Sequence, residues 1–321
     1  MSVASATVPV RGLCHSEGML DIAIRTENWQ KHVRVSEETL RDLVLRIGGD
    51  GDRFLVVQRI PDIPDEFIQV WHEDGGGFQL EHRAGAPERH FVVEGGDAER
   101  VASVMARWAR REVAWDRGLG WAPADLPLPE PVPELAAELR ETLEERVREL
   151  LRCGYDDRER LAETAEDYLV EGDVRPVSRA QAAALVDRLW LERVHEMADW
   201  TGTTDPERIT AAFESLERAG ITARENFTCC RNCGTTEIGG EGDEDARGFV
   251  FFHFQCTEGA ANGGALYLLY GGFDGTAEST VEVGHEVARA LRGQGLTVEW
   301  DGSPESSMLV TGLDWRKRLT G

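Results

Sequence analysis

The sequence predicts an α+β protein with an N-terminal meander sheet and two helices, a helical middle segment, and a small mixed C-terminal sheet flanked by helices. Three observations support this prediction. Short alternating segments separated by turn residues fill the first part of the chain, apolar residues recur at helical spacing after a proline-rich stretch, and both patterns occur in the last third. A chain of 321 residues suits two or three domains.

Residues 1–18 are small and mixed in character and are predicted to be a mobile tail. An α+β domain is predicted over residues 19–126, where a strand at 19–25 precedes a helix that Ser36 opens and Gly48 closes. Four short strands then follow at 53–59, 66–73, 78–83 and 90–94, separated by turns rich in Gly, Pro and Asp. Asp97 opens a second helix whose apolar residues share one face: Val101, Val104, Met105 and Trp108.

Three histidines, His72, His82 and His90, fall on the predicted strands of this domain. Alternation along a strand places His72 and His82 on otherwise apolar faces. No cysteine or carboxylate spacing nearby completes a set of metal ligands. They are therefore interpreted as core or rim residues.

A proline-rich linker is predicted at 127–133, because Pro127, Pro129, Pro131 and Pro133 alternate with Leu, Glu and Val. The helical segment at 134–200 follows, with three apolar stripes that begin near Leu135, Leu161 and Ala182. Because such helices cannot bury a face alone, we expect them to pack together or on the C-terminal sheet.

The C-terminal α+β domain is predicted over residues 201–321. Thr204 and Glu207 have the spacing of a capping box with Pro206 in the first turn, and Gly220 ends that helix. An extended segment, 221–228, leads to the cysteine cluster, and a glycine-rich loop follows at 239–245. Strands are expected at 247–255, 265–270, 296–300 and 307–311, with a helix from Ser279 to Gly295 that a second capping box opens.

The charge balance argues against nucleic-acid binding. The formal net charge is -24, whereas affinity for a phosphate backbone comes largely from clustered Arg and Lys. A strongly acidic surface can attract a basic protein partner. The sequence contains no segment of about 20 apolar residues that could span a membrane, and no signal-peptide pattern.

The predicted location is therefore the cytoplasm, where the cysteines would stay reduced. Their spacing then indicates metal or redox chemistry more than structural disulfides. Cys230 and Cys233 have the two-residue gap that lets two thiolates bind one tetrahedral ion, and His253 with Cys256 could supply the other two ligands of a zinc site. On a continuous strand, however, His253 and Cys256 would point to opposite faces.

Two other interpretations of the cluster stay open. A Cys-x-x-Cys pair after a strand can be redox-active when a long helix begins beneath it, but residues 234–240 are too short and glycine-rich for such a helix. The cysteines, Cys229 in particular, can also be small buried hydrophobes. The sequence contains no phosphate-binding loop, nucleophile elbow, paired-histidine metalloprotease motif or dinucleotide fingerprint.

Several motifs carry a resemblance, which covers the chain from about Leu135 to its end. They are Thr204-Asp205-Pro206-Glu207, the ENFTCCRNCG motif at 225–234, Phe251-Phe252-His253 and VEWDG at 298–302. This part resembles an uncharacterised family of high-GC bacterial domains of unknown function, which implies no activity. The N-terminal domain, through segments 67–73 and 78–83, resembles small α+β immunity-type proteins that neutralise toxins.

The leading functional hypothesis is a non-enzymatic cytoplasmic protein of the immunity or adaptor kind that binds a basic partner. The alternative is a zinc- or thiol-dependent enzyme centred on Cys230 and Cys233, with His253 beside them.

Overall fold

The computed structural model describes residues 18–243 and 245–319; apart from Gly18, the predicted tail lies outside this range. Contacts between Cα atoms divide the chain into two compact units. Unit 1 contains the chain up to residue 144, residues 157–199 and the end of the chain from 319. Unit 2 contains residues 145–156 and 200–318. Each unit is described separately.

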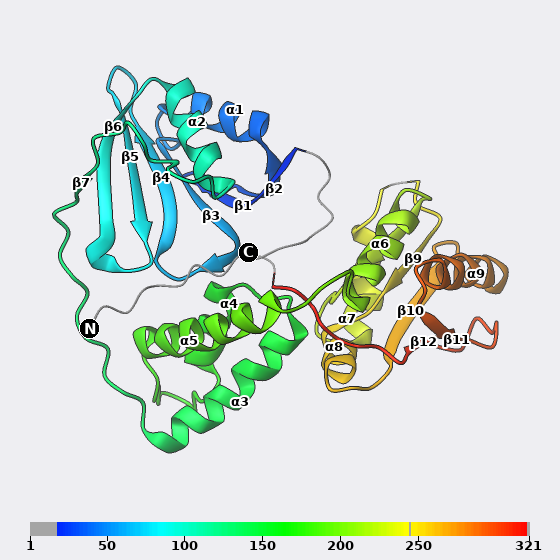
Figure 1. Cartoon of the computed structure of the whole chain (residues 1–321). Coiled ribbons are helices and arrows are strands. Elements are labelled where there is room, and N and C mark those ends of the chain that lie inside the picture. The colour runs from blue at the N-terminus through cyan, green and yellow to red at the C-terminus, as the bar shows by residue number, and fades with distance from the viewer. Residues whose placement is uncertain (1–17, 244, 320–321) are drawn as a thin grey trace. The chain divides into compact units, whose positions relative to one another are not determined.

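Unit 1 is built on an antiparallel seven-stranded sheet with the order β2-β1-β3-β4-β5-β6-β7. The strands are β1 (Met19–Thr26), β2 (Lys31–Ser36), β3 (Phe54–Ile63), β4 (Glu66–His72), β5 (Phe78–Ala84), β6 (His90–Gly96) and β7 (Ala122–Pro123). Two helices, α1 (Glu37–Arg46) and α2 (Ala98–Ala109), cover one face of this sheet (Figure 1). They begin where the sequence predicts, because Ser36 and Asp97 accept hydrogen bonds from the backbone of their first turns.

Strand β2 corrects the sequence-based topology, which has a single strand before α1. It pairs with β1 as a hairpin through a turn that contains Trp29 at φ 65°. The turn lacks the glycine or proline that normally signals a hairpin, so the sequence pattern predicts only the first of the two strands. The rest of the predicted meander, from β3 to β6, is confirmed.

The histidines of this sheet have different surroundings. His82 is buried among three aromatic rings, stacked on Phe91 at 5.0 Å and edge-on to Trp115 and Trp121 at 5.0 and 4.6 Å. His90 is also buried, and its Nε2 lies 3.0 Å from Glu81. Both observations support the interpretation of these histidines as core residues.

Three helices follow residues 124–136, which form neither helix nor strand. They are α3 (Ala137–Cys153), whose residues belong to both units, α4 (Arg158–Asp167) and α5 (Arg179–Ala198). Helices α4 and α5 pack against each other in unit 1. Trp190 of α5 is fully buried and donates a hydrogen bond of 2.6 Å to the carbonyl oxygen of Asp62. Among the described helices, none combines the length and hydropathy that crossing a bilayer requires.

Unit 2 contains a mixed five-stranded sheet with the order β11-β12-β10-β9-β8, in which β8 and β9 are parallel. Its core lies between this sheet and the helices α6 and α9. The elements are α6 (Asp205–Glu217), β8 (Ile221–Arg224), α7 (Arg231–Glu237), β9 (Gly248–Phe251), α8 (Phe254–Ala261), β10 (Leu266–Gly272), α9 (Ala277–Gly293), β11 (Thr297–Glu299) and β12 (Met308–Thr311).

Two boundaries in unit 2 differ from the sequence prediction. Helix α9 begins at Ala277 because Thr276, rather than Ser279, is its N-cap and accepts from the Ser279 amide. The strand expected over 247–255 stops at Phe251, and α8 begins at Phe254. The aromatic run Phe249–Phe254 has the composition of a strand, although the strand stops at Phe251 and the last residue of the run begins a helix. At the start of α6, Glu207 accepts from the Thr204 amide at 2.8 Å, as the predicted capping box requires.

Candidate metal centre

The loop between β8 and α7 carries the cysteines, and hydrogen bonds hold it in place at Glu225 and at Phe227. Glu225, which follows β8, accepts hydrogen bonds from the Tyr155 hydroxyl at 2.6 Å and from Lys317 Nζ at 3.2 Å. The amide of Phe227 donates to the carbonyl of Phe252 at 2.8 Å. The chain therefore enters the cysteine cluster along a path determined by segments that are distant in sequence.

The loop then makes a sharp turn through two residues with positive φ, Asn226 at 50° and Thr228 at 60°. Such angles are uncommon outside glycine, although asparagine tolerates them better than most residues. Tertiary hydrogen bonds stabilise the turn: Thr257 Oγ1 donates to the Asn226 side chain at 2.7 Å, and the Phe254 amide donates to the Thr228 carbonyl at 3.1 Å. The turn orients the following cysteines.

Helix α7 is placed by a close contact at Gly234. A Cβ atom at this position would lie 2.4 Å from the Phe251 ring, so only glycine lets the helix approach β9 this closely. Cys230 is the N-cap of α7 and Cys233 lies in its first turn. The glycine of the Cys-x-x-Cys-Gly pattern thus packs α7 closely against β9, and this contact positions Cys233, the residue before it.

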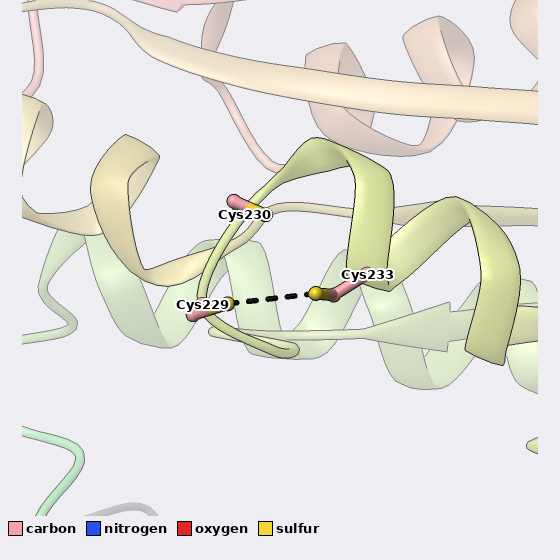
Figure 2. A group of neighbouring side chains, drawn as sticks. All are labelled: Cys229, Cys230 and Cys233. Atoms are coloured by element: carbon pink, nitrogen blue, oxygen red, sulfur yellow. Dashed lines mark hydrogen bonds between the residues drawn. The ribbon is translucent and has the colours of Figure 1, made fainter.

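Three sulfur atoms converge at this point, those of Cys229, Cys230 and Cys233, all within 4.8 Å of one another. Figure 2 shows Cys229 and Cys233 facing each other between the loop and α7, with the Cys229 thiol donating to the Cys233 sulfur at 3.6 Å. Tetrahedral thiolate ligands at about 2.3 Å from zinc are separated by about 3.8 Å. In the thiol trio, Cys229, Cys230 and Cys233, the Cys229–Cys233 separation matches that of one such ion, and the third sulfur lies within 4.8 Å of both.

The thiols differ in exposure and acidity. Cys229 is exposed, while Cys230 and Cys233 are half-buried. The pKa of Cys230 is lowered, first by a hydrogen bond from the Cys233 backbone and then by the neighbouring thiols. The pKa of Cys233 is raised to about 11, because its proton is shared with Cys229 and Cys230 and their charges oppose its ionisation. A second thiolate here is therefore costly unless a cation offsets the charge.

The four residues that the sequence suggested as ligands fall into two places. Cys230 and Cys233 belong to the thiol trio, whereas His253 and Cys256 face each other with 3.3 Å between the Nε2 and Sγ atoms. The argument that these two side chains would point to opposite faces is wrong, because His253 is the N-cap of α8 and Cys256 lies in its first turn. Within the described residues, neither is part of a group of three or more metal-binding side chains.

Burial disfavours the charged forms of both members of the His253–Cys256 pair. Each is 8% exposed. Burial raises the pKa of the Cys256 thiol, while burial, together with the positive charge of Arg231, lowers the pKa of His253. The pair is therefore a neutral, buried contact beneath the loop that carries the trio.

The structure corrects the interpretation of Cys229 and bears on the redox interpretation of the Cys-x-x-Cys pair. The interpretation of Cys229 as a buried hydrophobe is wrong, because its side chain is exposed and contributes a sulfur to the trio. The ligand set that the sequence suggested does not include Cys229, although its position directly before the Cys-x-x-Cys pair indicates a third candidate ligand. The long helix of a thioredoxin-like redox site is not found after the pair: α7 has seven residues.

Comparison with known proteins identifies the larger part of the chain. Residues 136–319, which include the whole cysteine site, match the family described as "Domain of unknown function (DUF6891)". The search of curated proteins gave no match, and neither did the search of solved structures. The chain therefore belongs to the DUF6891 family of uncharacterised domains.

Proposed function

We propose that the DUF6891 domain of this protein binds one zinc ion through Cys229, Cys230 and Cys233. The observation that carries the proposal is the convergence of three sulfur atoms within 4.8 Å, of which the Cys229–Cys233 separation of 3.6 Å is close to that of a tetrahedral thiolate site. Thiolates select soft or borderline ions such as zinc over magnesium and calcium. Three protein ligands leave one position of a tetrahedral ion for water or another ligand, which is the ligand number of catalytic zinc sites rather than of closed structural ones.

Zinc analysis of the full-length protein, purified in reducing buffer without chelator, tests this function. We expect about one zinc per chain, and loss of most of it in Cys229→Ser and Cys233→Ser, because each removes one of the three ligands. Cys153→Ser is the matched control: Cys153 is a buried cysteine whose thiol pKa burial raises to about 12, and it lies outside the trio. This variant should keep its zinc.

The same measurement distinguishes the trio from the four-ligand set that the sequence suggested. Cys256→Ser should retain its zinc if the trio binds the ion alone. If Cys256→Ser and Cys233→Ser lose equal amounts of zinc, the ligands are instead the four residues that the sequence suggested. A wild-type protein that takes up no zinc after reduction and incubation with the metal would exclude the proposed function.

A second function concerns unit 1, which we propose docks a basic segment of a partner protein. The observation that favours it is the presence of exposed aromatic residues at one end of the sheet: Trp29 is 95% exposed, and Phe54 and Trp71, paired across β3 and β4, are 38% and 39% exposed. Large exposed aromatic residues are typical of protein interfaces.

Charge complementarity indicates the partner. Exposed acidic residues flank the aromatic group in the adjoining turns: Asp50, Glu73 and Asp74. Arginine and lysine bind aromatic faces as well as carboxylates, and the whole chain carries a net charge of -24. The resemblance of this domain to immunity-type proteins, which bind other proteins, is consistent with this role. We call the six residues Trp29, Asp50, Phe54, Trp71, Glu73 and Asp74 the aromatic–acidic patch.

Binding of a labelled peptide of alternating arginine and leucine, measured by fluorescence anisotropy at physiological salt, tests this patch. The Trp29→Ala/Trp71→Ala variant should bind about tenfold more weakly, since interface tryptophans commonly contribute more than about 1 kcal/mol each. Tyr168→Ala removes an aromatic residue that is 48% exposed elsewhere in unit 1, and should bind like the wild type. Equal affinities for all three proteins, or for an acidic peptide, would contradict the docking function.

A further inference from the structure

Unit 1 contains a cavity of about 310 Å³ beside the sheet face opposite α1 and α2. Strands β1 and β3 contribute one side, and helices α4 and α5 contribute the other. Its size is at the lower end of the range of small-molecule sites. The lining combines three alanine methyl groups with charged side chains: Ala23, Ala162 and Ala183 with Arg25, Lys31, Arg158, Arg179, Asp62, Asp157, Glu159 and Asp187.

The cations around the cavity are all engaged by carboxylates. Arg25 contacts Asp157 and Glu159, and Lys31 also contacts Asp157. Arg179 contacts Glu163 and Glu166, which lie just outside the lining. The lining itself contains four cations and four carboxylates. Because each of these cations already pairs with a carboxylate, the cavity offers no unpaired cation to an anionic ligand.

Arg158 bridges two carboxylates of the lining. Its Nε donates to Asp62 at 2.7 Å and its Nη1 donates to Asp187 Oδ1 at 2.5 Å. The other oxygen of Asp62 accepts from Gln58 at 3.0 Å, so both of its oxygens have partners. Arg158 thus donates to both Asp62 and Asp187, but only Asp62 has a hydrogen-bond partner for each of its carboxylate oxygens.

Asp187 differs, because no group in the described part of the chain donates to its Oδ2 atom. Burial is the main reason that its pKa is raised, and the charges of Asp65 and Asp62 act in the same direction, although Arg158 opposes them. A partly buried carboxylate with a free acceptor in a concave site is a typical position for a ligand's donor group.

We propose that this cavity binds a small organic cation, with its ammonium or guanidinium group on the free Oδ2 atom of Asp187 and its aliphatic part on the alanine methyl groups. A primary amine supplies a charged hydrogen-bond donor for the Oδ2 atom of Asp187, because Arg158 donates only to Oδ1. A short alkyl chain fits the methyl surface of Ala23, Ala162 and Ala183. This site lies in unit 1 and is independent of the proposed zinc site in unit 2.

A ligand-detected NMR titration of the full chain with 1,4-diaminobutane tests this site, with butane-1,4-diol and succinate as neutral and anionic controls. The diamine should bind saturably and the two controls should not. Asp187→Asn should weaken binding at least about tenfold, because a charge-assisted hydrogen bond is lost. Asp173→Asn is the matched control, since it removes the same charge from an exposed position of unit 1 and should change the affinity less than about twofold if one site is responsible.

A second variant separates loss of the site from loss of the fold. Ala183→Leu fills the cavity without changing any charge, and should also abolish binding while the circular dichroism spectrum stays that of the wild type. Equal weakening by Asp187→Asn and Asp173→Asn would show only non-specific attraction to an acidic protein and would overturn the proposal. Preference for succinate, or no saturable diamine binding, would overturn it as well.

Discussion

An Arg59→Met variant should lose about 3 kcal/mol of the free energy of unfolding of unit 1. Arg59 is 8% exposed, and its guanidinium donates two hydrogen bonds to the Trp108 carbonyl, at 2.7 and 3.2 Å. It also lies 3.8 Å from the centre of the Trp108 ring and forms an ion pair with Glu66. Burial lowers the pKa of Arg59 to about 10, so the side chain stays charged at neutral pH. Methionine would leave a buried carbonyl and a carboxylate without their partner.

Urea unfolding of the full chain measures this loss. Arg53→Met is the matched control, because Arg53 pairs with Glu27 near the surface and its removal should leave the midpoint close to that of the wild type. Adding Glu66→Gln to Arg59→Met should recover part of the stability, since it removes the carboxylate left unpaired. Equal midpoints for Arg59→Met and Arg53→Met would contradict the assigned role of Arg59.

Acidification should destabilise unit 1 through His82, by about 3 kcal/mol between pH 6.5 and pH 4. Burial lowers the pKa of this histidine from its ordinary 6.5 to about 4, and the charge of His90 acts in the same direction, although Asp116 opposes both. The folded state therefore holds His82 neutral where the unfolded chain would protonate it. This contribution to stability is complete above pH 6.5 and is lost as the pH falls toward 4.

The measurement is the free energy of unfolding in urea at several pH values between 4 and 7. The effect of His82 is the slope of this free energy against pH. His82→Phe keeps an aromatic ring among Phe91, Trp115 and Trp121 but cannot be protonated, so its slope should be shallower than that of the wild type. His72→Phe makes the same exchange at a half-buried histidine that stacks on Phe78. Parallel slopes for His82→Phe and the wild type, or an equal flattening in His72→Phe, would contradict this prediction.

The sequence predicts the elements of this fold best where the signal is local. Ser36 and Asp97 were recognised as helix starts because an N-cap side chain bonds within its own first turn. Strand β2 and helix α8 were missed for the opposite reason. The hairpin turn at Trp29 and the end of β9 at Phe251 depend on pairing with other strands. Such pairing cannot be predicted from the local amino-acid composition.

The candidate site shows the same division. The Cys-x-x-Cys spacing identified Cys230 and Cys233, because neighbouring turns of a chain bring such thiols together. The contribution of Cys229 depends on the positive φ angles of Asn226 and Thr228, which in turn depend on hydrogen bonds from Thr257 and Phe254. These bonds join segments more than twenty positions apart in the sequence. The position of the Cys229 sulfur beside the other two could therefore be recognised only from the folded structure.

The anchoring of the cysteine loop has a consequence for the order of events during synthesis. The carboxylate of Glu225 accepts hydrogen bonds from Tyr155, made 70 residues before it, and from Lys317, made 92 residues after it. A ribosome therefore releases the thiols well before their final support exists. The cysteine loop therefore reaches its final anchoring only after Lys317 is made, so the thiols emerge before the contact that fixes their geometry can form.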